Sequence, residues 1–221
     1  MRRRALLPPP APMPRTQRRG HLRRERLLRA ACELIERLPL AEVTYSGVCA
    51  RAGVPPSSAH HFYPDLDAIF RALLETHRNA LDMALMRPVR ARDARSWQAI
   101  VECLVDRAAR YHRAHPVSAK LAVGGETPPQ IKRIDRDADR GRAGFALNLV
   151  EELFVVPRFT RKERVAYVAT ELVDTVFTAS MLETGRLTPH YIRLAKIAAI
   201  GFLAHYFGSS LPRRTAASNE R

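Results

Sequence analysis

Apolar residues recur every three or four positions through most of this 221-residue chain, and that spacing limits what it can fold into. An α-helix has about 3.6 residues per turn, so this spacing places apolar side chains on one face of a helix. One such stripe runs from Leu27 to Ile35 and ends before Pro39. No segment alternates apolar and polar residues between turns, as a strand would. The pattern predicts an all-α fold.

Proline, glycine and capping residues divide the chain into expected helices. The first should begin near Thr16, and Gly53 should turn the chain with a positive φ. Thr160 and Glu163 fit a capping box at the start of the next-to-last helix. Further helices are expected over about 45–52, 56–62, 65–87, 96–114, 160–184 and 189–207, with another ending near 154. The last is apolar nearly all round, so it is either a core helix or half of an interface.

The formal net charge is +15, which points to a polyanionic partner, either nucleic acid or an anionic membrane surface. Residues 1–29 hold ten arginines against a single acid, Glu25. Residues 1–15 are also proline-rich, so we expect a disordered basic arm there, and a disordered tail over 212–221. No run of apolar residues is long enough for a transmembrane helix, and the N-terminus lacks the apolar segment of a secretion signal. Three widely spaced cysteines predict free thiols.

Residues 43–70 contain two short expected helices joined by the Gly53 turn, which is the pattern of a helix-turn-helix. Thr44 stands at the start of the first of them, where a hydroxyl and free backbone amides bind a phosphate. The second helix carries small or planar polar side chains that suit the major groove, and Tyr63 follows it within reach of a phosphate. These DNA-binding candidates are Thr44, Pro56, Ser57, Ser58, His60, His61 and Tyr63. Taken singly, Ser57 could instead cap the helix, and either histidine could pack on a neighbour.

Residues 18–85 resemble the DNA-binding domain of the tetracycline-repressor (TetR) family of bacterial transcription factors. The matching positions are Arg24, Leu27, Leu28, Ala30, Ala31, Leu34 and Ile35, then Thr44, Val48, Ala50, Arg51, Ala52, Gly53 and Val54, then Phe62, Tyr63, Pro64 and Ile69. Three positions depart from the family pattern. Pro55 replaces a capping Ser or Thr, His60 replaces a Tyr, and Leu66 replaces a Lys that clamps a phosphate. Arg51, Arg71 and the arginines of the first helix are the replacements we consider for that lost cation.

The resemblance implies a helix-turn-helix domain over residues 16–64 and a helical ligand-binding and dimerisation domain over 65–211. It places the dimer interface on the last two helices, although packing within one subunit is the rival reading. The interface candidates are Val173, Val176, Phe177, Ile200, Leu203 and Phe207. A small-molecule pocket would lie among the middle helices, with Trp97, Tyr111, His112, Phe145 and Asn148 as candidates for its lining.

Motifs for other chemistry are absent or incomplete. The acidic run Asp135–Asp139 resembles a calcium loop, but Arg140 and Ala146 stand where that loop needs Gly and Glu, which favours a solvated, self-paired helix face. His112 and His115 lack a third metal ligand. No catalytic motif occurs. We therefore expect no metal, no cofactor and no enzymatic activity.

The sequence favours a cytoplasmic, homodimeric transcriptional regulator, a repressor in the family's usual mode, which binds double-stranded operator DNA and an unknown small-molecule effector and has no membrane partner. The alternative is an all-α small-molecule-binding protein or enzyme whose basic arm binds nucleic acid non-specifically. A third reading is a basic protein that binds nucleic acid or anionic lipid through the arm alone.

Overall fold

The computed structural model describes residues 15–214, apart from the side chains of residues 15–17, 134 and 135. The described chain is helical and holds no β-strand, with a single isolated bridge between Phe154 and Arg213. In chain order its helices are α1 (Arg15–Arg37), η1 (Leu40–Glu42), α2 (Tyr45–Ala52), α3 (Pro56–Ala59), α4 (Leu66–Leu85), η2 (Ala91–Ala94), α5 (Trp97–Ala114), α6 (Pro116–Ala122), α7 (Pro129–Leu153), α8 (Lys162–Thr184) and α9 (Pro189–Phe207). The all-α expectation is confirmed. The expected arm and tail lie outside the described residues, except for residue 15 and residues 212–214.

Most of the expected helix boundaries are confirmed by caps. The Thr44 hydroxyl accepts a hydrogen bond from Gly47 N, and the Asp65 carboxylate accepts one from Ala68 N at 2.6 Å. Ser96 and Thr188 cap α5 and α9 in the same way. Gly53 ends α2 with a φ of 60°, the left-handed conformation that glycine adopts at least cost.

Two expected boundaries were wrong. The third helix ends at Ala59 instead of Phe62, because the chain tightens into turns in which Phe62 N and Tyr63 N both donate to Ala59 O. The capping box of α8 does not form. Its N-cap is Arg161, which adopts a left-handed φ of 60°, and no side chain caps the helix. Thr160 therefore lies one residue too early for its hydroxyl to reach the first turn.

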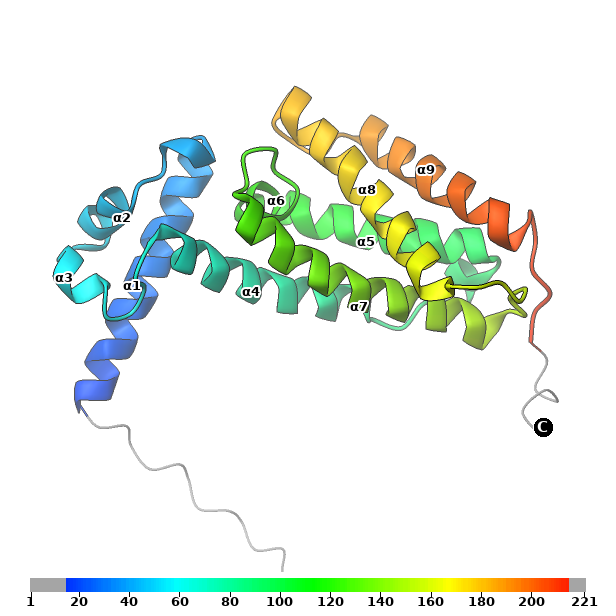
Figure 1. Cartoon of the computed structure of the whole chain (residues 1–221), viewed down its shortest axis with the longest axis horizontal. Helices are drawn as coiled ribbons and strands as arrows, with labels where there is room; N and C mark the ends of the chain where they lie inside the picture. The colour runs from blue at the N-terminus through cyan, green and yellow to red at the C-terminus, as the bar shows by residue number, and fades with distance from the viewer. Residues whose placement is uncertain (1–14, 215–221) are drawn as a thin grey trace, which may run out of the picture.

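The helices form two connected parts, which Figure 1 shows side by side. At one end, α2 and α3 pack across α1, and α4 leads away from them into the body. The body is made of α4 to α9, with α8 lying along α9 and α7. Its core includes Trp97, which is fully buried with its ring edge-on to Phe207 at 5.3 Å.

The core beside α1 is not confined to residues 16–64. It includes Ile35 from α1, Val48 from α2 and Phe70 from α4. It also includes Leu121 from α6 and Ile131 from α7, both with no exposed surface. The α1–α4 region therefore shares one apolar core with the body.

Helix α8 is the one described helix with the length and composition to cross a bilayer. Length and composition alone are weak evidence for a membrane span, because core helices of soluble proteins share them. Helix α8 packs against both α7 and α9. The three cysteines are free thiols, with Cys49 buried and Cys32 and Cys103 half-buried.

Candidate functional site

An arginine of α1 contacts the turn between α2 and α3. The Arg26 guanidinium donates to Ala52 O at 2.5 Å and to Gly53 O at 3.1 Å. A β-carbon at Gly53 would lie 2.8 Å from the same guanidinium, which would have to shift, but the left-handed φ of 60° is what favours glycine here.

Helix α3 and the turn that follows it present a small polar surface. Ser57, His60 and His61 are exposed, Ser58 is half-buried and Ala59 packs into the core. Pro55 occupies the N-cap position and supplies no side-chain hydrogen bond. The sequence predicted that Pro55, in place of a Ser or Thr, would leave α3 without its side-chain cap, and this is confirmed. The Ser57 hydroxyl does not cap the helix instead.

His60 is held in one orientation by two neighbours. Its ring stacks on Tyr45 with centroids 4.8 Å apart, and its Nδ1 lies 2.9 Å from Pro64 O. A carbonyl oxygen only accepts, so Nδ1 carries the hydrogen, and the Nε2 of the neutral ring is an acceptor. Tyr45 in turn donates from its hydroxyl to Tyr63 O at 2.7 Å. Sequence reasoning missed Tyr45, because its partners are 15 or more residues away.

Tyr63 and Thr44 differ in how much they offer to a phosphate. Tyr63 is buried, with 7% of its surface exposed, and burial raises its pKa. Its ring therefore belongs to the core, and the phosphate role of its hydroxyl stays a prediction. Phe62, beside it, is half-buried beneath the Arg24 guanidinium. Thr44 is exposed; its hydroxyl oxygen accepts from Gly47 N at 3.1 Å and lies 3.3 Å from the Ser46 hydroxyl, with which it shares a hydrogen bond.

The positive charge beside this surface comes mainly from α1. Its arginines at 18, 19, 23, 24, 26 and 29 are all exposed. Arg51 forms a salt bridge with Glu33, and Arg71 lies 3.8 Å from the Asp65 carboxylate. Each of those two side chains therefore has a carboxylate beside it that offsets part of its charge.

The body contains a partly open cavity of about 130 Å³ lined by residues of α4 to α9. Two of the five predicted pocket residues line it, His112 and Phe145. Trp97 and Tyr111 lie in the surrounding core instead, and Asn148 is exposed on α7. Most of the lining is aliphatic, which a helical pattern alone cannot distinguish from ordinary core.

The polar lining of the cavity contains a neutral histidine and a group of charges. Burial, and then the positive charge of Arg142, lower the pKa of His112 to about 3. Its Nδ1 lies 3.2 Å from the Ser118 hydroxyl. Asp139, expected on a solvated face, is instead 2% exposed and forms an ion pair with Arg142. The Asp137–Arg140 pair of that acidic run is solvated as expected.

Comparison with known proteins decides the family. Residues 95–207, just over half of the chain, match the family model described as "Tetracyclin repressor-like, C-terminal domain". The chain belongs to the TetR family. It is a TetR-family transcriptional regulator with a helical DNA-binding fold, and members of this family are generally regulators rather than enzymes.

Solved TetR-family structures share the fold over nearly their whole length. A regulator from Streptomyces coelicolor is 17% identical, with a TM-score of 0.60 over 83% of this chain and 99% of that chain. A regulator from Rhodococcus sp. RHA1 is 19% identical, with a TM-score of 0.57 over 84% and 97%. The flavonoid-responsive regulator FrrA is 17% identical, with a TM-score of 0.50 over 85% and 98%. No curated protein sequence matches the chain.

The expected TetR-type interface residues divide into two groups. Val173, Phe177, Leu203 and Phe207 are buried within the subunit. Their burial favours the alternative in which these residues pack within one subunit, because other residues of the same chain already cover their apolar faces. Val176 and Ile200 are half-buried. The exposed apolar side chains on these helices are Leu182 and Ile197, each 66% exposed, and Leu194.

No group of three or more His, Cys, Asp or Glu side chains with the geometry of a metal site occurs among the described residues. His77, Tyr111 and His115 do come together, with the Tyr111 hydroxyl 3.0 Å from His77 Nδ1. They lie where α4 meets the end of α5. The sequence pattern places His112 and His115 one turn apart as possible metal ligands. In the structure, the ring of His115 lies beside the ring of His77.

Proposed function

We propose that the protein is a ligand-responsive repressor that binds operator DNA as a homodimer and reads its sequence with α2 and α3. The observation that carries this proposal is the exposed polar surface of α3 beside the arginines of α1. Contacts to phosphates position a protein on DNA, whereas contacts to base edges select the sequence. The α1 arginines would supply the first kind of contact and α3 the second. Such a repressor would act in the cytoplasm.

The exposed polar side chains of α3 and of the turn that follows it have chemistry that suits the major groove. The Ser57 hydroxyl and the His61 ring can each donate to or accept from a base edge. The bond from His60 Nδ1 to Pro64 O leaves Nε2 to accept from an adenine or cytosine amino group. Thr44, with the free amides of the first turn of α2, would bind a backbone phosphate.

Dimerisation would place two such units on successive major grooves. Leu182, Leu194 and Ile197 support an interface on α8 and α9, because they are large apolar side chains exposed on adjacent helices. A two-fold arrangement would bury these side chains in both subunits at once. We therefore propose these three exposed side chains as interface residues, in place of the buried residues that the apolar pattern predicted.

A ligand would act by shifting a conformational equilibrium. The cavity contacts α4 through Leu81 and Leu85, and α4 runs directly to the DNA-binding unit. A compound that favours a conformer with wrongly spaced α3 helices would release DNA. A structural relative that is described as flavonoid-responsive supports a response of this kind.

Selection of bound sequences from random duplex DNA tests the proposal. We expect a palindromic site, and we expect His61→Ala to weaken binding to it by about tenfold or more, as loss of a base contact does. His190→Ala is the control, because His190 is exposed at the start of α9. If no palindromic site emerges, or if both variants bind alike, the proposal fails.

Deleting residues 2–14 separates this proposal from the alternative in which the basic arm binds nucleic acid without sequence preference. We expect the truncated protein to keep its preferred site while losing some affinity and some salt dependence. Complete loss of binding would favour the alternative.

A further inference from the structure

We propose that a surface hollow between α5 and the segment that joins α4 to α5 binds a small molecule with two or three linked phosphate groups. We call it the arginine hollow. It shares no lining residue with the cavity of the body and includes none of the DNA-binding candidates, so it would be a second ligand site, independent of the proposed repressor function. Three observations support it: how the hollow is built, which charges line it, and where it lies relative to α3.

One wall of the arginine hollow is a single face of α5. Residues three or four apart lie on the same face of a helix, and the α5 residues of this wall have that spacing. They are Ala99, Glu102, Cys103, Asp106, Arg107 and Arg110. The opposite wall is formed by residues 87–95, which include η2. The hollow has a volume of about 520 Å³, which is in the range of small-molecule sites.

Arg107 ties the two walls together. Its guanidinium donates from Nη1 to Leu85 O at 2.8 Å and from Nη2 to Pro88 O at 2.9 Å, and Nη1 also donates to Arg87 O. The last carbonyls of a helix lack partners within it, and α4 ends at Leu85. Arg107 therefore fastens the end of α4 and the start of the 87–95 segment to α5, which holds the shape of the hollow without a ligand.

Arginines outnumber carboxylates in the lining. The charged side chains of the hollow are six arginines and three acids, namely Arg87, Arg90, Arg92, Arg95, Arg107 and Arg110, with Asp93, Glu102 and Asp106. Two of the acids already lie beside a cation. The Asp93 carboxylate lies 3.7 Å from Arg92. The Asp106 carboxylate forms an ion pair at 2.7 Å with Lys196 of α9.

Four of these arginines, Arg87, Arg90, Arg95 and Arg110, are exposed and form no ion pair with any described residue. Of the acids in the lining, Glu102 alone remains to offset them, and it is half-buried on α5. The hollow therefore carries positive charge on both walls that the described side chains leave uncompensated.

This arrangement favours linked phosphates. A guanidinium presents its N–H donors in a planar fork that matches the oxygens of a phosphate or a carboxylate. One carboxylate is satisfied by one such fork, whereas each phosphate has three acceptor oxygens, so linked phosphates can bind arginines of both walls at once. An anionic membrane or a docked protein fits less well, because no aromatic or large aliphatic side chain lines the hollow.

The hollow lies at the end of α4 that is remote from α3. Helix α4 begins at Leu66, beside the DNA-binding unit, and leads into the body as far as Leu85, where the hollow begins (Figure 1). A helix of this length spans about 30 Å. The arginine hollow is therefore not a continuation of the basic surface beside α3.

Calorimetric titration of the full-length protein with orthophosphate, pyrophosphate, tripolyphosphate and citrate tests the inference. In about 0.15 M salt, affinity should rise from orthophosphate to pyrophosphate to tripolyphosphate, by about tenfold or more over the series. Citrate carries several carboxylates in place of phosphates and should bind more weakly than pyrophosphate.

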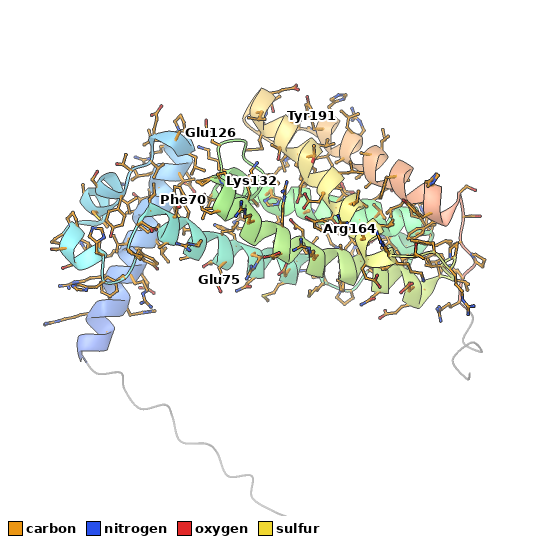
Figure 2. All side chains as sticks on the ribbon, viewed as in Figure 1. Phe70, Glu75, Glu126, Lys132, Arg164 and Tyr191 are labelled. Carbon is orange, nitrogen blue, oxygen red and sulfur yellow. The ribbon has the colours of Figure 1, made fainter. Side chains whose placement is uncertain are left out.

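The decisive variant removes one arginine from each wall, Arg90→Gln with Arg110→Gln. Its affinity for tripolyphosphate should fall by about tenfold or more, because two charge-assisted contacts are lost. The matched control is Arg158→Gln with Arg164→Gln, which changes the net charge equally. Both control residues are exposed and lie outside the hollow, and Arg164 is labelled in Figure 2. The control should lose about twofold at most.

Equal losses in the two double variants would overturn the inference, because binding would then follow net charge alone. Absence of tripolyphosphate binding, or tighter binding of citrate than of pyrophosphate, would also overturn it. A short random DNA duplex should bind wild type and Arg90→Gln with Arg110→Gln equally, and weaker binding by the variant would assign the hollow to nucleic acid instead. Selection of a palindromic operator is measured separately, so the repressor proposal can fail while this site stands, and the reverse.

Discussion

The Lys120 ammonium group lies 2.6 Å from Ile35 O and 2.9 Å from Leu38 O, at the carboxyl end of α1. Close by, the Glu126 carboxylate, labelled in Figure 2, accepts from Leu40 N at 2.8 Å. The last carbonyls of a helix lack partners within it, and they attract a cation. Two side chains of the body, separated from their partners by more than 80 residues, thereby complete the end of α1.

Replacing Lys120 with Met should destabilise the protein, because it leaves half-buried carbonyls at the end of α1 without a donor. We expect a loss of about 1–3 kcal/mol in the free energy of unfolding, measured with urea at one fixed protein concentration. Lys132→Met is the control, since the Lys132 ammonium group has no hydrogen bond or ion pair to any described residue. Equal losses in the two variants would contradict this role for Lys120.

His112 makes stability depend on pH. The unfolded ring takes up a proton near pH 6.5, whereas the folded ring does so only near 3. Its contribution to stability is therefore complete above about pH 6.5 and is lost as the pH falls towards 3. For His112 alone, we expect a loss of about 2 kcal/mol between pH 7 and pH 5. The lowered pKa of His77, caused first by burial, acts in the same direction.

The test compares urea unfolding of wild type and His112→Asn near pH 7 and pH 5. Asparagine keeps a polar group near Ser118 but does not titrate, so the variant should show the shallower dependence on pH. His190→Asn should behave like wild type, because His190 is exposed. Equal slopes for all three proteins would show that His112 does not remain neutral in the fold.

Gly53→Ala should destabilise the helix-turn-helix by about 1–2 kcal/mol, through its left-handed backbone and the contact with Arg26. Gly141→Ala is the opposite case. Gly141 lies within α7 with no atom within 4 Å of an added β-carbon, so the change should stabilise by up to about 1 kcal/mol. Thermal melts of the two variants should move in opposite directions, and a common direction would refute the argument.

Ile197→Asp should shift the protein from dimer to monomer if α8 and α9 form the interface, because the carboxylate would be buried against its own copy. Met83→Asp is matched to it, since Met83 is 75% exposed on α4. Sedimentation equilibrium measures both masses. A monomeric wild type, or a dimer that persists in Ile197→Asp, would exclude this interface.

Local signals account for what the sequence predicted well. Proline, glycine and short polar side chains act within one turn of a helix, so Gly53, Asp65 and Thr188 could be interpreted correctly on their own. The capping box at Thr160 failed because the backbone of Arg161 is set by the packing of the preceding loop. No local pattern reports such packing.

Contacts between distant segments account for what was missed. The apolar pattern of α8 and α9 does not reveal which face is covered by the same chain, so Phe177 and Phe207 were assigned to an interface. The position of Asp139 between arginines in the sequence predicts a surface residue. Its burial was missed because it depends on Arg142 and the neighbouring helices. His60 stacks on Tyr45, and Lys120 donates to carbonyls at the end of α1. The spacing of residues in the sequence predicts neither contact.

The apolar core that joins α1 to α6 limits how the protein can be recombined with its relatives. A hybrid regulator that joined residues 15–64 to an unrelated sensor would leave the core to which Ile35 and Val48 belong without Leu121 and Ile131. The transferable unit therefore includes α4 and the facing surface of α6. Operator preference can change freely only through residues on the outer face of α3, since Ala59 on its inner face belongs to this core and α3 packs against α1 and α2.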